Sequence, residues 1–212
     1  MVDLKSMSNK KKVEYIWEYY KLHIIGVLAA IFIAVSFIHG QITRIDYVFN
    51  LALVGNNVDE NKKTEVEKQL TNIVIKAGER KKQARIEVIP LEGSSKANAL
   101  MSNGNTQKFI AEISVGEIDL VVLDKSMFES FVKQDMFSRL DNIRGLSLTS
   151  IKNKKIEAMG NGNIKAVYAI DAGDIKIIKD MGFDTEGMVI GIISTCKQKE
   201  KAATVIKWLL NK

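Results

Sequence analysis

Acidic side chains are the residues of this 212-residue chain that are best suited to chemistry. Asp119 and Asp124 bracket the apolar run Leu120–Leu123, and Glu129 follows five residues later. Two carboxylates can act as general acid and base when both reach one substrate. Side chains alternate along a strand, so Asp119 and Asp124 should point to opposite faces. A carboxylate-dependent hydrolase using Asp119, Asp124 or Glu129 is therefore the least favoured of three hypotheses.

The other reactive residue types do not combine into a site. The chain has two histidines, His23 and His39, and both flank an apolar segment near the N-terminus. A Ser–His–Asp triad or a histidine metal site is thus excluded from the rest of the chain. Cys196 is the one cysteine, so an intrachain disulfide is impossible and we expect a small buried residue. We expect no catalytic residues, no metal and no cofactor, and hence no enzyme.

A small-molecule pocket is a second possibility. The segment Leu91–Asn105 is rich in Gly, Ser and Asn, and Asp124 ends an apolar strand. Ligands of open α/β sheets bind beyond the carboxyl ends of the strands. In the alternative interpretation Asp124 caps the following helix, which a capping box at Ser126–Glu129 would open. The candidate ligand-binding residues are Ser94, Ser95, Asn98 and Asp124.

Periodicity defines the elements that would position these residues. Apolar or alternating runs predict strands at Ile45–Val54, Arg85–Ile89, Leu120–Leu123, Ile156–Met159, Ile164–Ile170 and Met188–Ile193. Apolar faces predict helices at about 59–77, 105–116, 126–132, 174–181 and 199–210. Gly160–Asn163 predicts a β-hairpin. The expected fold is α/β: an N-terminal transmembrane helix, then a single three-layer domain with a mostly parallel sheet plus the hairpin.

The apolar segment Leu22–Thr43 determines where the chain is placed. It contains no Lys, Arg, Asp or Glu and, as a helix, is about as long as the hydrocarbon core of a bilayer, roughly 30 Å. We therefore expect residues 22–43 to form a transmembrane helix whose partner is the lipid bilayer. The expected anchor residues are Trp17, Tyr20, Lys21, Ile24, Ile25, Leu28, Ile31, Phe32, Ile33, Val35, Phe37 and Ile38.

Charges on the two sides of the segment indicate its orientation. Lys5, Lys10–Lys12 and Lys21 precede it, whereas only Arg44 follows it closely. The positive-inside rule then predicts a cytoplasmic arm at 1–21 and an extracytoplasmic domain at 44–212 in the cell membrane. A cleaved signal peptide is the alternative, because Ala34–Ser36 offers small residues, although the apolar run continues beyond them.

The basic surplus of the chain does not predict a nucleic-acid-binding protein. The formal net charge is +6, and the lysines of the outer domain are spread over several helices without interleaved aromatic residues. We interpret them as a solvated surface and expect no nucleic acid partner.

The segment around Phe137 and Leu140 is taken to be exposed, where it could serve as an interface.

The order of segments resembles a known family. QKFIAEISVGEIDLVVLDKSMFESFVKQDMFSRLDNI and the tail GMVIGIIS followed by KEKAATVIKWLL are similar to parts of bacterial extracellular solute-binding proteins (periplasmic type 2) of ABC transporters. The resemblance implies one lobe of such a protein, here truncated and membrane-anchored. A second lobe has no room between Asn142 and Ile156, so the usual clamp on a solute is in doubt. No ligand residues are transferred.

Three hypotheses follow from these patterns. The leading one is a single-pass membrane protein that displays a binding or interaction domain, as an accessory of a transporter or of an envelope complex. Its partner would be a membrane or envelope protein. The second is a ligand sensor with its pocket near Leu91–Asn105 and Asp124, and the third is the hydrolase.

Overall fold

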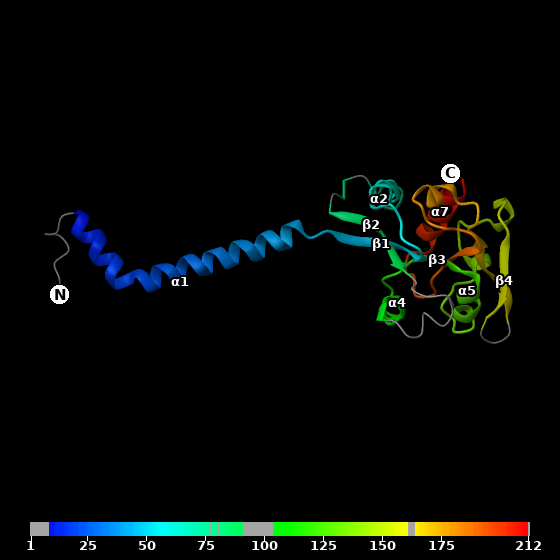
Figure 1. Ribbon diagram of the computed structural model, residues 1–212, viewed down its shortest axis with the longest axis horizontal. Helices are drawn as coiled ribbons and strands as arrows, with labels where there is room; N and C mark the ends of the chain where they lie inside the picture. The colour runs from blue at the N-terminus through cyan, green and yellow to red at the C-terminus, as the bar shows by residue number, and fades with distance from the viewer. Residues whose placement is uncertain (1–8, 77, 80, 91–103, 161–163, 212) are drawn as a thin grey trace. The chain divides into compact units, whose positions relative to one another are not determined.

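The chain divides into two units, Met1–Ile45 and Asp46–Lys212, and each is described by itself. The structure is a computed structural model that describes residues 9–76, 78–79, 81–90, 104–160 and 164–211 (Figure 1). The candidate residues Ser94, Ser95 and Asn98 lie outside these ranges.

The part of the first unit that the structure describes is dominated by a helix, α1, at Asn9–Thr43. Its stretch Trp17–Gly40 has a mean hydropathy of 2.3, and none of this stretch is buried. Apolar side chains such as Leu28, Phe32 and Phe37 are all exposed along it. An apolar helix of this length fits a membrane anchor or a signal sequence.

The second unit is built on one six-stranded sheet in the order β2-β1-β3-β6-β5-β4. The strands are β1 (Asp46–Gly55), β2 (Lys82–Pro90), β3 (Leu120–Asp124), β4 (Lys155–Met159), β5 (Lys165–Asp171) and β6 (Met188–Ile192). β1 pairs in parallel with β2 and β3, whereas β6 is antiparallel to β3 and to β5, and β5 is antiparallel to β4.

The sheet is therefore mixed, and the prediction of a mostly parallel sheet was wrong. The parallel half comes from β1, β2 and β3, which are separated by helices. The hairpin of β4 and β5 was predicted, but its place in the sheet was not. β6 inserts between β3 and β5 antiparallel to both, so it joins the hairpin to the parallel half as one sheet.

Helices cover both faces of the sheet, as the three-layer prediction required. α2 (Glu60–Val74), α6 (Lys176–Asp180) and α7 (Lys199–Leu210) pack on one face, and α4 (Gly104–Val115) and α5 (Lys125–Val132) on the other. In Figure 1, α2 and α7 lie above the sheet and α4 and α5 below it. Alternation along β1 divides its side chains between the two faces. Leu51 and Leu53 belong to the core shared with α2 and α7, and Ala52 and Val54 belong to the core shared with α4 and α5.

The second unit contains all of the hydrophobic core that the structure describes. Every buried apolar residue of the described ranges belongs to 46–212, from Phe49 to Leu209, whereas the described apolar side chains of Trp17–Gly40 are outside it. Burial of such a core is the dominant driving force of folding. The unit therefore has what it needs to fold without α1.

Two local predictions are corrected. Phe137 and Leu140 are buried, not exposed, because Phe137 forms a β-bridge with Ile193 and Leu140 begins a 3-10 turn that packs against β5. Helix α5 also does not begin with a capping box at Ser126. Its N-cap is Asp124, whose carboxylate accepts the Ser126 backbone N–H, so Ser126 is already inside the first turn.

Candidate functional site

Asp124, the predicted ligand residue, lies at the carboxyl end of β3, where it was expected. Its Oδ1 accepts hydrogen bonds from the backbone N–H of Ser126, at 2.8 Å, and from the Ser126 hydroxyl. These contacts satisfy an N–H that the first turn of a helix leaves without a partner. The capping role that the sequence left as an alternative is thus the one that the geometry shows.

The crevice beyond the carboxyl ends of β1 and β3 is filled by the chain itself. The Phe183 ring lies over Gly55, where a Cβ would come within 2.9 Å of it. Asn56 at the end of β1 donates to the Gly182 carbonyl at 3.0 Å and accepts from the Asp184 N–H at 2.9 Å. This is where an open α/β sheet ordinarily receives a ligand, and here the segment 182–187 occupies it.

Asp119 directly precedes β3 and Asp124 is its last residue, so the two side chains lie at opposite ends of the strand. Asp119 is buried and accepts the Asn50 backbone N–H at Oδ2, at 3.0 Å. Its Oδ1 accepts the Cys196 thiol at an Sγ–O distance of 3.1 Å. The three residues tie β1, β3 and the segment after β6 together, and the carboxylates of Asp119 and Asp124 cannot act on one substrate.

Burial has the largest effect on the pKa values of the Asp119 carboxyl and the Cys196 thiol. Desolvation raises the pKa of the Asp119 carboxyl, against the lowering effect of the hydrogen bonds from Asn50 and Cys196. Desolvation, followed by the neighbouring Asp119, raises the pKa of the Cys196 thiol to about 12. A thiol of this pKa is protonated at neutral pH and is a poor nucleophile.

A groove of about 740 Å³ runs beside the edge strand β2, between β2 and α2. The residues around it include Tyr47, Lys63, Glu67, Arg85, Val88 and Pro90. The Arg85 guanidinium carbon lies 5.9 Å from the centre of the Tyr47 ring, within the range of a cation–π interaction. Acidic, basic and aromatic groups thus share one open surface.

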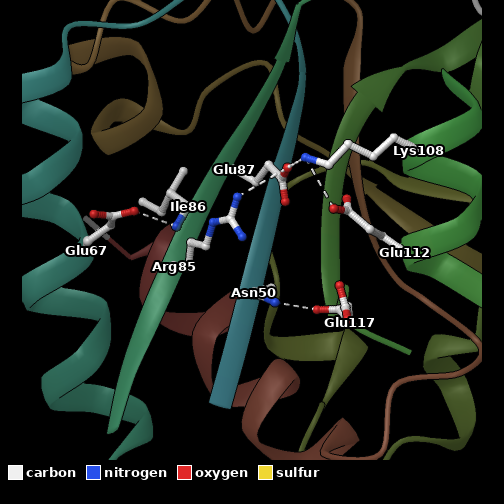
Figure 2. Close-up of polar contacts among 8 residues, drawn as sticks. All are labelled: Asn50, Glu67, Arg85, Ile86, Glu87, Lys108, Glu112 and Glu117. Atoms are coloured by element: carbon white, nitrogen blue, oxygen red, sulfur yellow. Dashed lines mark hydrogen bonds and ion pairs between the residues drawn. The ribbon is translucent and has the colours of Figure 1, made fainter. Parts of the chain in front are cut away.

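An ion-pair network joins β2 to α4 beside this groove, whose lining also includes Arg85 and Glu87 (Figure 2). Glu87 accepts from Lys108 of α4 at 2.7 Å and lies 3.3 Å from Arg85 on the same strand. Lys108 also contacts Glu112 at 3.3 Å, and the two carboxylates raise the pKa of the lysine. Glu112 Oε2 is buried with no hydrogen-bond partner among the described residues. The network fixes α4 on the sheet.

The described residues contain no group of three or more His, Cys, Asp or Glu side chains placed to hold a metal ion.

The residues that the sequence reasoning missed are basic. Two lysine-rich segments, at 76–82 and 197–201, come to the same end of the domain. Their local density of lysine was the available signal, but their proximity depends on the pairing of β1 with β2 and on the docking of α7.

No family model and no curated protein matches the chain. A similar solved structure is the extracellular solute-binding protein family 1 from Alicyclobacillus acidocaldarius subsp. acidocaldarius DSM 446. The match has 16% sequence identity, a TM-score of 0.31, and covers 60% of this chain and 28% of that chain. The chain thus spans less than a third of the length of that protein. At this TM-score the match transfers no ligand, site or activity to the chain.

Proposed function

We propose that the protein is a single-pass membrane protein that displays its α/β domain outside the cytoplasm and acts by binding a membrane or envelope protein. The observation that carries this proposal is α1. Its apolar stretch of 24 residues has no buried share, and the core of the domain does not include it. In water such a surface is costly, at about 25 cal/mol for each Å² of apolar area, whereas lipid accepts it.

The orientation follows from the charges that flank the helix. Lysines cluster before the apolar stretch, and Arg44 alone follows it closely. Basic residues near the ends of a membrane helix are retained on the cytoplasmic side. The domain at 46–212 would then be extracytoplasmic.

The polar residues of the domain favour binding over catalysis. Asp124 is used as a helix cap, and Asp119 is buried against Asn50 and Cys196. The crevice at the carboxyl ends of β1 and β3 holds Phe183. The groove beside β2, by contrast, is open, and its charged and aromatic lining suits contact with a protein surface better than an enclosed catalytic site.

Fractionation and protease protection test this function together. We expect the full chain to stay in the membrane pellet after alkaline carbonate extraction, and an added protease to digest the domain, but not the arm at 1–21, in intact spheroplasts. Intact-mass analysis distinguishes an anchor from a cleaved signal sequence. Full-length protein in the aqueous fraction, or protection of the domain, would contradict the proposal.

The partner is tested by crosslinking from membranes with the anchor intact. Arg85→Glu reverses a charge in the groove, and Arg144→Glu is a matched change elsewhere on the surface of the domain. We expect Arg85→Glu to reduce recovery of a specific crosslinked protein and Arg144→Glu to leave it unchanged. Equal recovery from both would exclude the groove as the binding surface.

A ligand sensor is the second candidate, favoured by the volume of the same groove. A bound ligand stabilises the native state by mass action. Sensing predicts a rise in the melting temperature of the domain with amino acids, sugars or oligopeptides. No shift at high ligand concentration would leave protein binding as the function.

A further inference from the structure

The two lysine-rich segments meet at the end of the sheet where β1 begins. The Lys81 carbonyl accepts the Asp46 backbone N–H at 2.8 Å, and Asp46 pairs in register with Lys82. From the other segment, the Gln198 side chain donates to the Val48 carbonyl at 2.6 Å. Both segments are thus fixed to the first three residues of β1.

We call this surface the basic end, which consists of Lys76, Lys81, Lys82, Lys197, Lys199 and Lys201. Lys82 forms an ion pair of 2.8 Å with Glu79, and the pKa of Glu79 is lowered by that hydrogen bond and by the charges of Lys82, Lys201 and Lys76. Lysines from both segments therefore act on one carboxylate, which places them around a common point. The carboxylates of the same region are those of Asp46, Glu79, Glu117, Glu200 and the buried Asp119, on which the charge of Lys201 also acts.

Two of these carboxylates are already paired. Glu79 binds Lys82, and Glu200 lies 3.7 Å from Arg144. The net charge of the basic end is therefore positive, and its lysines other than the half-exposed Lys82 are open to solvent.

The opposite end of the same strands has the reverse sign. Asp59 caps α2 directly after β1, and Asp184 binds the loop that follows the strand. The carboxylates at this end include Asp171, which is level with Asp124 in the sheet, and Asp174, which lies 4.0 Å from Lys179; the others are Asp59, Glu60, Asp124, Asp180, Asp184 and Glu186. The ammonium groups at this end include those of Lys62, Lys63, Lys125, Lys154, Lys176 and Lys179. The domain thus has a charge asymmetry along the direction of β1.

Chain continuity relates the basic end to the membrane. Only Arg44 and Ile45 lie between α1 and β1. Three Cα–Cα steps reach at most about 11 Å, so the first residue of β1 cannot leave the vicinity of the helix end. The chain therefore enters the domain at its positively charged end, two residues after α1.

We propose that the basic end is a membrane-contacting surface that binds the anionic headgroups of the bilayer in which α1 is anchored. This inference rests on the proposed membrane anchor. Lysines near an anionic bilayer each contribute about 1 kcal/mol, or about fivefold in partition, and the attraction is screened beyond a Debye length. Contact at the basic end turns the acidic end and its loops away from the membrane.

Vesicle cosedimentation of residues 44–212 tests the surface without the anchor. We expect the domain to bind vesicles that contain phosphatidylglycerol and not vesicles of phosphatidylcholine alone. Binding should be lost when the Debye length falls from about 30 Å to about 3 Å on going from 0.01 M to 1 M salt. The variant Lys81→Gln/Lys199→Gln/Lys201→Gln should bind on the order of 100-fold more weakly.

The matched control is Lys62→Gln/Lys125→Gln/Lys179→Gln, which makes the same change in net charge at the acidic end. We expect it to bind anionic vesicles as the unchanged domain does, with circular dichroism showing that both variants are folded. Absence of binding, equal binding to both lipids, or equal losses in the two variants would overturn the proposal. So would binding of soluble polyphosphate without binding of vesicles. None of these results would affect the carbonate extraction of the full chain, so the anchor and the surface are judged separately.

Discussion

Glu67 Oε1 accepts a hydrogen bond from the backbone N–H of Ile86 at 2.8 Å (Figure 2). Ile86 lies in β2, the strand at the edge of the sheet, and this N–H points away from β1. Thr71 of the same helix accepts the Ala84 N–H at 3.0 Å in the same way. Two backbone donors that would be open to another strand are thus occupied by side chains of α2.

Removing the acceptor should expose this edge. We expect Glu67→Ala to lower the free energy of unfolding by about 1 kcal/mol, because a partly buried donor loses its partner. It should also introduce concentration-dependent self-association, measured by light scattering. Glu65→Ala changes an exposed residue of the same helix and should do neither. Monomeric, fully stable Glu67→Ala would show that the contact does not protect the edge.

Substitutions near the start of α5 test whether Asp124 or Glu129 caps the helix. We expect Asp124→Ala to lower the free energy of unfolding by about 0.5–2 kcal/mol in urea denaturation, the usual cost of a lost N-cap. Asp124→Ser retains a capping oxygen and should cost much less. Glu129→Ala should have little effect, since the helix does not begin with a capping box. A larger loss from Glu129→Ala than from Asp124→Ala would reverse this assignment.

The raised pKa of Asp119 predicts an unusual pH dependence. The unfolded chain releases this proton near pH 4, whereas the native protein keeps it to higher pH. In that window the native state binds more protons than the unfolded state, so the contribution of Asp119 to stability is present below pH 4 and is lost as the pH rises. The stability of Asp119→Asn relative to the unchanged protein should therefore increase with pH across this window. A difference that is constant with pH would contradict the raised pKa.

Cys196 should be almost unreactive in the native protein. Its thiol is buried, and its pKa is raised to about 12, so little thiolate forms at neutral pH. We expect labelling by Ellman's reagent to be slow in buffer and fast in denaturant, with rates that follow unfolding. Because this is the single cysteine of the chain, the signal has one source. Rapid labelling in buffer would mean that the contact with Asp119 opens readily.

Local pattern was sufficient to predict most elements. The run Leu120–Leu123 became β3, and the predicted final helix has the bounds of α7, Lys199–Leu210. These elements are set by apolar periodicity within a short window, which is a property of the sequence alone. The hairpin of β4 and β5 was likewise predicted by its glycine- and asparagine-rich turn.

Long-range pairing could not be predicted in the same way. A buried apolar strand such as Met188–Ile192 has no feature that selects its neighbours or its direction, so the antiparallel insertion of β6 was missed. Capping was mistaken because both Asp124 and Ser126 are good N-cap residues, and only the backbone shows which one precedes the helix. The proximity of Lys82 to Lys201 depends on how the 118 residues between them fold.

The position of β6 has a consequence for how the domain is made. β6 follows β5 in the chain but separates it from β3, so a nascent chain that ends before Met188 has two partial sheets, each with an open side. Formation of the complete sheet must therefore await synthesis of the residues from Met188 onward. A chain that is made or exported stepwise would have to stay unfolded, or be bound by a chaperone, until Met188–Ile192 is available for pairing.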